Sequence, residues 1–378
     1  MRNEALILNT KQQQFMMHFD HLHFYVTHAQ ASRDWFIQKL GFQAQGCVIS
    51  SHTHTEIVQQ GRVYFLLSSP VNNQGPVAEY LHQHPPGVID VAFQVDGIES
   101  VLQNMKAENV KVIQPLQQYS IDNSWIKWCT VVGWSGLHHT LVEQQGSPNW
   151  KLLPSVPFPI PGSEVYSDLI GIDHTVLNVN SGELKPAVNW YQRVFGWGEK
   201  QTFDIKTERS GLYSQVLVNP ENTVKFPINE PTSETSQIQE FLDYNRGAGI
   251  QHIALRTDNI IQLVPQLRQQ GLSFISVSPF YYSLLKEKNK IQELSLEEWQ
   301  QIQKSEILLD RSELDAILLQ IFTQPIFAEP TLFFEFIERR KRFSNGYLVE
   351  ADGFGEGNFQ ALFEAMEQEQ IKRNENKK

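Results

Sequence analysis

Short apolar segments alternate with amphipathic segments along the chain, and one order of segments occurs twice. Residues 19–42 and 172–197 both begin with Asp-His in an apolar run, pass through a loop into an amphipathic segment with an aromatic pair, and end near a glycine. Residues 88–105 and 249–267 form a second matching pair. Short apolar runs predict strands, and a spacing of three to four residues predicts helices. Each half therefore contains two strand-then-helix units related by an internal repeat.

Further apolar runs predict additional strands after these units. They are residues 62–70, 128–134 and 137–144 in the first half, and residues 213–219, 223–228, 318–324 and 331–338 in the second. Short strands with a few helices on one side are typical of the α+β class. The charged segment 281–313 is an insertion of the second half, and we expect it to be helical.

Chain length and proline content predict two domains. A chain of 378 residues is long for a single hydrophobic core. The proline-rich segment 151–166 separates the repeats, and proline neither donates to a strand ladder nor continues a helix. We place an N-terminal domain at 1–150, a linker at 151–166 and a C-terminal domain at 167–378.

Charge and composition exclude several classes of partner. The formal net charge is −11, which argues against nucleic acid or an anionic membrane as partner. The two cysteines, Cys47 and Cys129, lack metal-binding spacing, so we expect both to be buried apolar residues of a reducing compartment. We find neither a secretory leader nor a long apolar run, and we expect a cytoplasmic protein.

Two histidines of the second half stand on apolar strand faces. All but two of the twelve histidines lie at or before His139, and the remaining two occupy matching places in GIDHTVL (His174) and GIQHIAL (His252). In TLFFEFIERR, the carboxylate of Glu335 is likewise flanked on its own face by apolar residues. A buried carboxylate needs a cationic or metal partner. Two histidines and one carboxylate match the ligand set of a non-haem Fe(II) oxygenase.

A purely structural interpretation is the alternative. Each histidine can be a hydrogen-bonded core residue, and Glu335 can pair with Arg339 or Arg340. The repeat favours the metal, because the aligned positions of the first half are His21, Asp90 and Thr140, which do not make the same ligand set. We therefore expect the first domain to be metal-free.

The glycine-rich motif GFGEGNF, residues 353–359, lacks the Lys-Ser/Thr of a phosphate-binding loop and the context of a dinucleotide fingerprint. We expect its glycines to form a hinge before a helix that starts near Asn358. The apolar residues of that helix recur at helical spacing.

The second half resembles the 4-hydroxyphenylpyruvate dioxygenase family, Fe(II) enzymes of the vicinal oxygen chelate superfamily. The matching motifs are spread over residues 167–371 and are, in order, GIDHT, SGLYSQVL, FPINEP, SQIQEFLDYNRGAGIQHIAL, LLQIFTQP, PTLFFEFIERR and GFGEGNFQALFEAMEQEQ. The first half resembles the family more loosely, through FDHLHFYV and GVIDVAFQVD. The resemblance implies an α+β fold of two tandem vicinal-oxygen-chelate domains built of βαβββ modules, each an open mixed barrel. The N-terminal domain then has a structural role or a role in oligomerisation.

The resemblance also implies the residues of the site. Fe(II) is then bound by His174, His252 and Glu335. The implied substrate-binding residues are Ser214, Asn229, Gln237, Gln251, Gln320, Phe322, Phe333, Phe354, Asn358 and Phe359, the last of them on a C-terminal helix that closes over the site. The family often has lysine where this chain has Gln324 and Glu356.

The implied reaction converts 4-hydroxyphenylpyruvate and O2 to homogentisate and CO2. The sister activity, 4-hydroxymandelate synthesis, is an alternative, although Phe322 favours the dioxygenase because the synthases tend to carry a smaller aliphatic residue there. A binding protein that has lost catalysis is a further alternative. We expect a small-molecule 2-oxo acid as substrate, and a homodimer or homotetramer.

Overall fold

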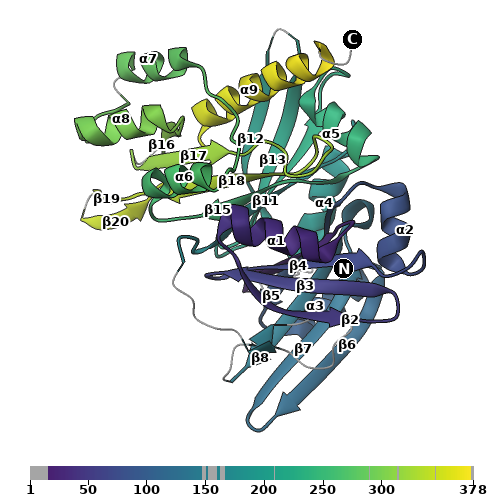
Figure 1. The fold of residues 1–378 in the computed structure, drawn as a ribbon. Coiled ribbons are helices and arrows are strands. Elements are labelled where there is room, and N and C mark those ends of the chain that lie inside the picture. Colours follow the sequence, from purple (N-terminus) through teal and green to yellow (C-terminus); the bar gives the residue numbers. More distant parts are fainter. Residues whose placement is uncertain are drawn as a thin grey trace, which may run out of the picture.

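Two eight-stranded mixed sheets with the same strand order form the body of the molecule (Figure 1). The computed structural model describes residues 16–146, 150–151, 160–161, 167–207, 209–288, 290–312, 315–344 and 346–375. The first sheet has the order β2-β3-β4-β1-β5-β8-β7-β6, and the second has the order β12-β13-β14-β11-β15-β18-β17-β16. This confirms the predicted repeat and the α+β class.

The elements of the first half are β1 (Met17–Tyr25), α1 (Ala29–Leu40), β2 (Gln43–Ile49), β3 (Thr53–Gln60), β4 (Val63–Pro70), α2 (Pro76–Gln83), β5 (Gly87–Val95), α3 (Ile98–Ala107), β6 (Val112–Ile121), β7 (Ser124–Val132), the short helix η1 (Trp134–Gly136) and β8 (His138–Gln145). Two short strands, β9 (Trp150–Lys151) and β10 (Ile160–Pro161), pair with each other. The rest of the predicted linker, 152–159 and 162–166, lies outside the described residues.

The elements of the second half are β11 (Gly171–Asn178), α4 (Leu184–Phe195), β12 (Gly198–Lys206), β13 (Gly211–Val218), β14 (Lys225–Pro231), α5 (Gln237–Asn245), β15 (Gly249–Arg256), α6 (Ile260–Gln269), α7 (Pro279–Glu287), α8 (Leu296–Lys304), β16 (Leu308–Arg311), β17 (Ile317–Phe322), β18 (Phe333–Arg339), the hairpin β19 (Lys341–Ser344) and β20 (Tyr347–Glu350), and α9 (Glu356–Glu375).

The repeat extends to the ends of its first helices. α1 ends at Gly41 with φ 69°, and α4 ends at Gly196 with φ 71°. Both residues adopt the left-handed conformation that glycine reaches without a steric penalty. The glycine that closes each unit in the sequence is therefore a helix C-cap.

The two sheets share one hydrophobic core. A continuous cluster of buried residues includes Phe24, Phe65 and Phe93 of the first half and Phe226 and Phe334 of the second. The rings of Phe65 and Phe334 stack with centroids 5.9 Å apart. His139 of β8 also bonds across the halves, since its Nε2 lies 3.0 Å from the hydroxyl of Tyr191 in α4. The halves are thus joined by direct packing.

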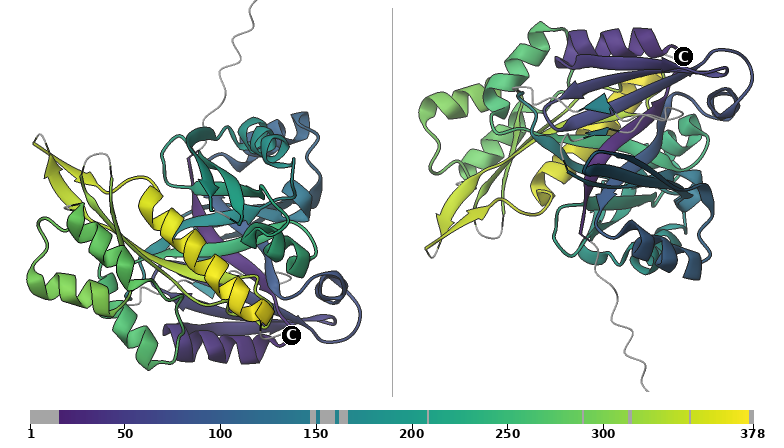
Figure 2. Two further views of the ribbon diagram at one scale, coloured as in Figure 1. Left: turned by 90° about the horizontal axis from the view of Figure 1, so that it is seen from above. Right: turned by 90° about the horizontal axis from the view of Figure 1, so that it is seen from below.

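α9 covers the second sheet on the side away from the first half (Figures 1 and 2). It begins at Glu356, close to the predicted start at Asn358. None of the described helices combines the length and apolar composition that crossing a bilayer requires.

Three predictions about local structure need correction. The insertion 281–313 forms helices α7 and α8 as predicted, but its end is the edge strand β16, because Leu308 and Leu309 pair with β17. The strands β2, β3, β6 and β12 were not predicted, and their faces carry many polar residues. Cys47 is exposed on β2 and only Cys129 is buried, so the expectation of two buried cysteines was wrong.

Candidate metal centre

Three neighbouring strands bring His174, His252 and Glu335 together. β11 pairs antiparallel with β15, and β15 pairs parallel with β18. The register places Ala254 of the middle strand opposite both His174 and Glu335. His252 lies two residues before Ala254 and therefore on the same face. The methyl group of Ala254 leaves room for the longer side chains on either side of it to meet.

The three candidate ligand side chains are buried and in contact. His174 Nε2 lies 3.2 Å from Glu335 Oε2, and His252 Nε2 lies 3.7 Å from the same oxygen. One ligand atom from each residue lies within 4.8 Å of the other two. Their exposed fractions are only 1%, 6% and 1% in chain order. The structure thus brings together all three predicted metal ligands in a group that is able to bind a metal ion.

A second layer of side chains orients these ligands. His174 Nδ1 donates to Asp173 Oδ1 at 2.9 Å, which leaves Nε2 as the ring nitrogen that faces the centre. Gln320 Nε2 donates to Glu335 Oε1 at 2.8 Å, so that Oε2 is the oxygen that faces the histidines. Arg339 Nε and Nη2 each donate to Asp173 at 2.7 Å.

The two arginines that the sequence offered as partners for Glu335 form ion pairs with other carboxylates. Arg339 pairs with Asp173, and Arg340 pairs with Glu338 and Glu298. Within the described part of the chain, neither arginine forms an ion pair with Glu335.

The electrostatics of the group favour a cation. Burial disfavours the charged form of His174, but the neighbouring Glu335 carboxylate and the bond to Asp173 outweigh it and raise the pKa of His174. Burial, reinforced by His174, holds the pKa of His252 well below its usual value. His252 is therefore a neutral imidazole, the form that binds metals. The Glu335 and Asp173 carboxylates stabilise a positive charge between them. The two imidazoles and the Glu335 carboxylate are ligands that fit a divalent metal ion.

A cavity of about 400 Å³, including its mouth, opens above the three ligands. Its walls come from β11, β12, β13, β14, β17, α9 and the segment that leads into α9. The lining residues besides the three ligands are Val176, Phe203, Ser214, Val216, Pro227, Asn229, Gln320, Phe322, Phe354, Phe359 and Leu362. The wall is mostly apolar and aromatic, with a few polar groups, as in small-molecule sites.

Some polar atoms of this wall have no partner. Ser214 Oγ, Asn229 Oδ1 and His252 Nδ1 are buried and make no hydrogen bond to the described residues. Buried polar atoms are normally satisfied, so unpaired ones around a cavity indicate a polar ligand or water. Ser214 and Asn229 are directly opposite each other on β13 and β14, so they form one polar spot.

Six of the ten predicted substrate-binding residues line the cavity, namely Ser214, Asn229, Gln320, Phe322, Phe354 and Phe359. Phe333 packs against the ring of His252 with centroids 4.8 Å apart. Asn358 donates to Gln320 Oε1 at 2.7 Å and accepts from the Tyr281 hydroxyl at 2.7 Å. The Gln320 amide is thus engaged at both ends.

Gln237 and Gln251 are buried but do not line the cavity. Gln237 lies in the first turn of α5, and Gln251 lies at a bulge of β15 beside His252.

Several residues of the cavity wall were not predicted from the sequence. Val176, Val216 and Pro227 lie two residues from His174, Ser214 and Asn229, so strand alternation was a usable signal for them. Phe203 and Leu362 had no such signal, because β12 and α9 reach the cavity only through the tertiary fold.

The corresponding positions of the first half bond to each other or to neighbours. Asp90 Oδ1 accepts from the Thr140 backbone at 2.9 Å, and its second oxygen accepts from the Thr140 hydroxyl. His21 Nδ1 is bonded to Asp20 Oδ1 at 2.7 Å. The register of β5 and β8 supports the alignment of Asp90 with His252 and of Thr140 with Glu335.

A family model described as the glyoxalase/bleomycin resistance protein/dioxygenase superfamily matches the chain twice, over residues 18–127 and 171–283. The two matches cover the two repeats.

Several proteins are similar over almost the whole chain. An uncharacterized protein of Synechocystis is 38% identical over 357 residues, which are 93% of this chain and 97% of the relative. The 4-hydroxyphenylpyruvate dioxygenases of Yarrowia lipolytica and Caenorhabditis briggsae are 36% and 35% identical, and each match covers 94% of this chain and 92% of the relative.

Among solved structures, a mutant of 4-hydroxymandelate synthase from Streptomyces coelicolor has a TM-score of 0.78 at 24% identity, over 93% of this chain and 98% of that one. This similarity is one of fold.

Proposed function

The chain belongs to the 4-hydroxyphenylpyruvate dioxygenase family, and on that premise we propose that it binds Fe(II) through His174, His252 and Glu335 and converts 4-hydroxyphenylpyruvate and O2 to homogentisate and CO2. The observation that carries the proposal is the buried pair of histidines with one carboxylate in the lining of a mostly apolar cavity. Atoms balance in this reaction, since CO2 is the carboxylate that the substrate loses, and both oxygen atoms of O2 enter homogentisate, one in its new carboxylate and one as the ring hydroxyl.

The ligand set supports the choice of metal. Two imidazoles and one carboxylate are the facial set of non-haem Fe(II) oxygenases, and they leave coordination positions open. When bound, the iron would hold the 2-oxo acid and O2 together and supply redox chemistry that side chains lack. With His174 and His252 neutral, the charges of Fe(II), Glu335 and a monoanionic substrate sum to zero. A neutral assembly avoids the cost of burying net charge.

The polar pair Ser214 and Asn229 is placed to bind the far end of the substrate. Asn229 is opposite Asn178, which lies four residues along β11 from His174. At about 3.3 Å per strand residue, the backbone of Asn178 and Asn229 lies about 13 Å from that of His174. The side chains of His174 and Asn229 both line the cavity. An arylpyruvate held by its 2-oxo acid at the metal would extend its phenol group toward this pair. Ser214 Oγ and Asn229 Oδ1, which have no hydrogen-bond partner among the described residues, are available to bond to it.

The aromatic residues are placed to hold the ring and exclude water. Phe322 lies beside His252, and Phe354 packs edge-on against His174 with centroids 4.9 Å apart. Phe359, in the first turn of α9, packs edge-on against Phe203 at 5.1 Å. Together they would fix the ring relative to the reacting side chain and shield both from solvent.

The segment before α9 gives this cover a hinge. Gly353 and Gly355 have φ of 80° and 66°, which side chains adopt only with strain. A Cβ at Gly355 would also lie 2.9 Å from Gln320 Oε1. We infer that α9 is a lid whose glycine hinge lets it open for substrate and close for reaction.

The experiment that tests the proposal is proton NMR of the product formed from 4-hydroxyphenylpyruvate, Fe(II), ascorbate and O2. Homogentisate shows a trisubstituted ring with an intact CH2, and this result supports the dioxygenase. A para-substituted ring with a CH(OH) signal indicates 4-hydroxymandelate and overturns the reaction proposed. Absence of any O2-dependent product overturns the choice of substrate.

A further inference from the structure

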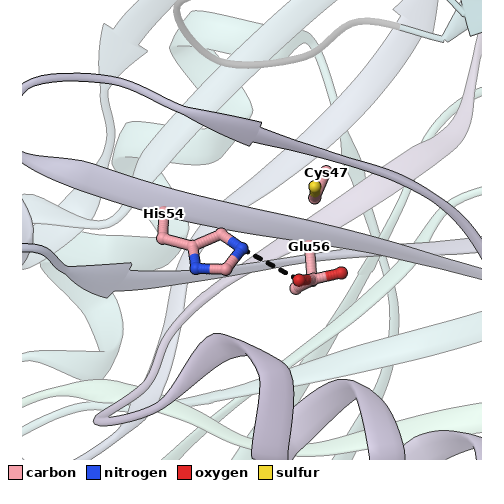
Figure 3. A group of neighbouring side chains, drawn as sticks. All are labelled: Cys47, His54 and Glu56. Atoms are coloured by element: carbon pink, nitrogen blue, oxygen red, sulfur yellow. Dashed lines mark hydrogen bonds and ion pairs between the residues drawn. The ribbon is translucent and has the colours of Figure 1, made fainter.

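A second group of metal-ligand side chains lies in the first half, on the hairpin of β2 and β3 (Figure 3). Cys47 of β2 is directly opposite Glu56 of β3 in the antiparallel register. His54 lies two residues before Glu56 and therefore points to the same side of the sheet. A β-bulge between Ala44 and Gly46 immediately precedes Cys47, and bulges re-aim the side chains that follow.

The three side chains of this group are in mutual reach. One ligand atom each from Cys47, His54 and Glu56 lies within 4.8 Å of the other two. His54 Nε2 lies 2.8 Å from Glu56 Oε1. Glu56 is only 2% exposed, whereas Cys47 is open to solvent. The group therefore has a fixed, buried carboxylate and an accessible thiol.

The cluster is distinct from the positions equivalent to the metal centre. Thr55, between His54 and Glu56, bonds to Ser68 and so faces the interior of the first barrel together with His23. His54 and Glu56 face the opposite side, where Arg33 of α1 lies. A metal at this cluster would depart from the expectation of a metal-free first domain, which rests on His21, Asp90 and Thr140.

The contacts of this cluster resemble those of the metal centre in the second half. In both places a buried carboxylate oxygen is close to a histidine Nε2, at 2.8 Å for Glu56 and His54 and at 3.2 Å for Glu335 and His174. We propose that Cys47, His54 and Glu56 bind a divalent metal ion of the Zn²⁺ type on the outer face of the first sheet, with water from the solvent side as the remaining ligand.

The charges around the cluster are consistent with a divalent cation. Arg33 Nη1 donates to Glu56 Oε2 at 3.0 Å, which leaves Oε1 for the metal. Arg33 also pairs with Asp34 at 2.8 Å, so its charge is shared between two carboxylates. With a thiolate at Cys47, the charges of Cys47, Glu56, Asp34, Arg33 and a divalent ion sum to zero.

The ligand types select the metal. A thiolate, an imidazole and a carboxylate together are typical ligands of Zn²⁺, and three protein ligands plus water form a tetrahedral site. The metal centre of the second half contains no sulfur ligand. The two sites are therefore distinguishable by any signal that requires a metal–sulfur bond.

The consequence of binding would be a cross-link at the edge of the molecule. β2 is the edge strand of the first sheet, and Cys47 is its contribution to the cluster. A metal bonded to Cys47, His54 and Glu56 would fasten this edge to β3, which is already tied to α1 through Arg33.

The test is a Co²⁺ titration of the full-length protein after treatment with a chelator. A thiolate-to-cobalt charge-transfer band in the near ultraviolet is expected from this cluster, and Co²⁺ at His174, His252 and Glu335 does not produce one. We expect Cys47→Ser and His54→Gln to lose the band and to bind about one equivalent less metal per chain. The matched controls are Cys129→Ala and His52→Gln, which we expect to keep it.

A second measurement does not depend on variants of Cys47. Alkylation of the Cys47 thiol in the wild-type chain, followed by mass spectrometry, should be slowed about tenfold or more by Zn²⁺, because a metal-bound thiolate is shielded from the reagent. In His54→Gln we expect little protection. Absence of the charge-transfer band in the wild-type chain, its persistence in Cys47→Ser or His54→Gln, or equal alkylation with and without Zn²⁺ overturns the proposal.

Discussion

Asp173 and Arg339 are joined by two hydrogen bonds of 2.7 Å each, and both side chains are buried. The same aspartate accepts from His174 Nδ1, and the same guanidinium donates from Nη1 to the backbone oxygens of Ala351 and Gly353. Burial opposes a charge on Asp173, but Arg339 and Lys225 hold its pKa well below the usual range. One ion pair therefore connects a candidate metal ligand with the hinge of α9.

Replacing Arg339 by lysine should weaken the metal centre. Lysine keeps the charge but not the planar pair of donors, so Asp173 would hold His174 less firmly. We expect a loss of about tenfold to a hundredfold in Fe(II) affinity, typical of partners behind the ligands. Iron retained after dialysis against graded chelator measures this. The matched control is Arg340→Lys, because the ion pairs that Arg340 forms with described residues are those with Glu338 and Glu298. Equal affinity in Arg339→Lys and wild type contradicts the role.

Enlarging Ala254 should separate the ligands. Its methyl group lies in the row between His174 and Glu335, so the branched side chain of Ala254→Val would occupy the space where they meet. We expect loss of bound iron with the strand pairing retained by circular dichroism. Ala254→Gly keeps that space at a cost of about 0.5–1 kcal/mol in stability and should bind iron. Iron binding in both variants would show that a small residue at position 254 is not needed for His174 and Glu335 to meet.

Removal of one imidazole should abolish turnover. In His252→Ala we expect neither stable Fe(II) binding nor product, because only His174 and Glu335 remain as ligands. The protein should stay folded, since the lost ring packs on Phe333 at the cavity and not in the shared core. Metal analysis and product NMR measure the two effects, with the exposed His82→Ala as control. Normal turnover in His252→Ala would refute the ligand assignment.

The ring of Phe359 should keep the amount of O2 consumed equal to the amount of product formed. Phe359 is half-buried and lines the cavity, and Phe359→Ala removes part of the roughly 1.5–3 kcal/mol that full burial of such a ring is worth. We expect kcat/KM to fall about tenfold to a hundredfold, and more O2 to be consumed per molecule of product because water reaches the site. An oxygen electrode combined with product quantification gives the ratio. Phe343→Ala, whose ring is 76% exposed on β19, should leave both quantities unchanged.

If kcat/KM and the O2 consumed per product changed equally in the Phe359 and Phe343 variants, this would contradict the function of Phe359. It would indicate a general loss of stability instead.

Acid should destabilise the fold through buried histidines. Burial lowers the pKa of His139 to about 4 and that of His23 to about 3. Between about pH 6.5 and pH 4 the unfolded chain binds protons that the folded chain does not, so the free energy of unfolding falls as pH falls. From about pH 7 to pH 5 we expect a loss of about 2 kcal/mol for each of these histidines.

Urea denaturation of wild type and His139→Gln at the two pH values isolates the contribution of His139. We expect the variant to lose about 2 kcal/mol less than wild type over this interval. His82→Gln, at an exposed histidine, should follow the wild-type curve. An unchanged pH dependence in His139→Gln would mean that His139 is not the group responsible.

Much of the fold could be predicted from the sequence, because its signals are local. The repeated order of strand, helix and closing glycine identified two similar halves, and strand alternation placed His174, His252 and Glu335 on apolar faces. The strands that escaped prediction, such as β2 and β3, carry polar residues on the side covered by α1, so their alternation does not mark a single buried face.

The sequence by itself determined which residue types are available in each repeat: two histidines and a carboxylate in the second, and His21, Asp90 and Thr140 at the same places in the first. Only the tertiary structure decided which of them meet. Strand register placed Ala254 between His174 and Glu335, and Cys47 opposite Glu56. It also paired Arg339 with Asp173 and not with Glu335. Such contacts join residues far apart in the chain, so the free energy that selects them comes from packing the whole fold and leaves no local pattern in the sequence.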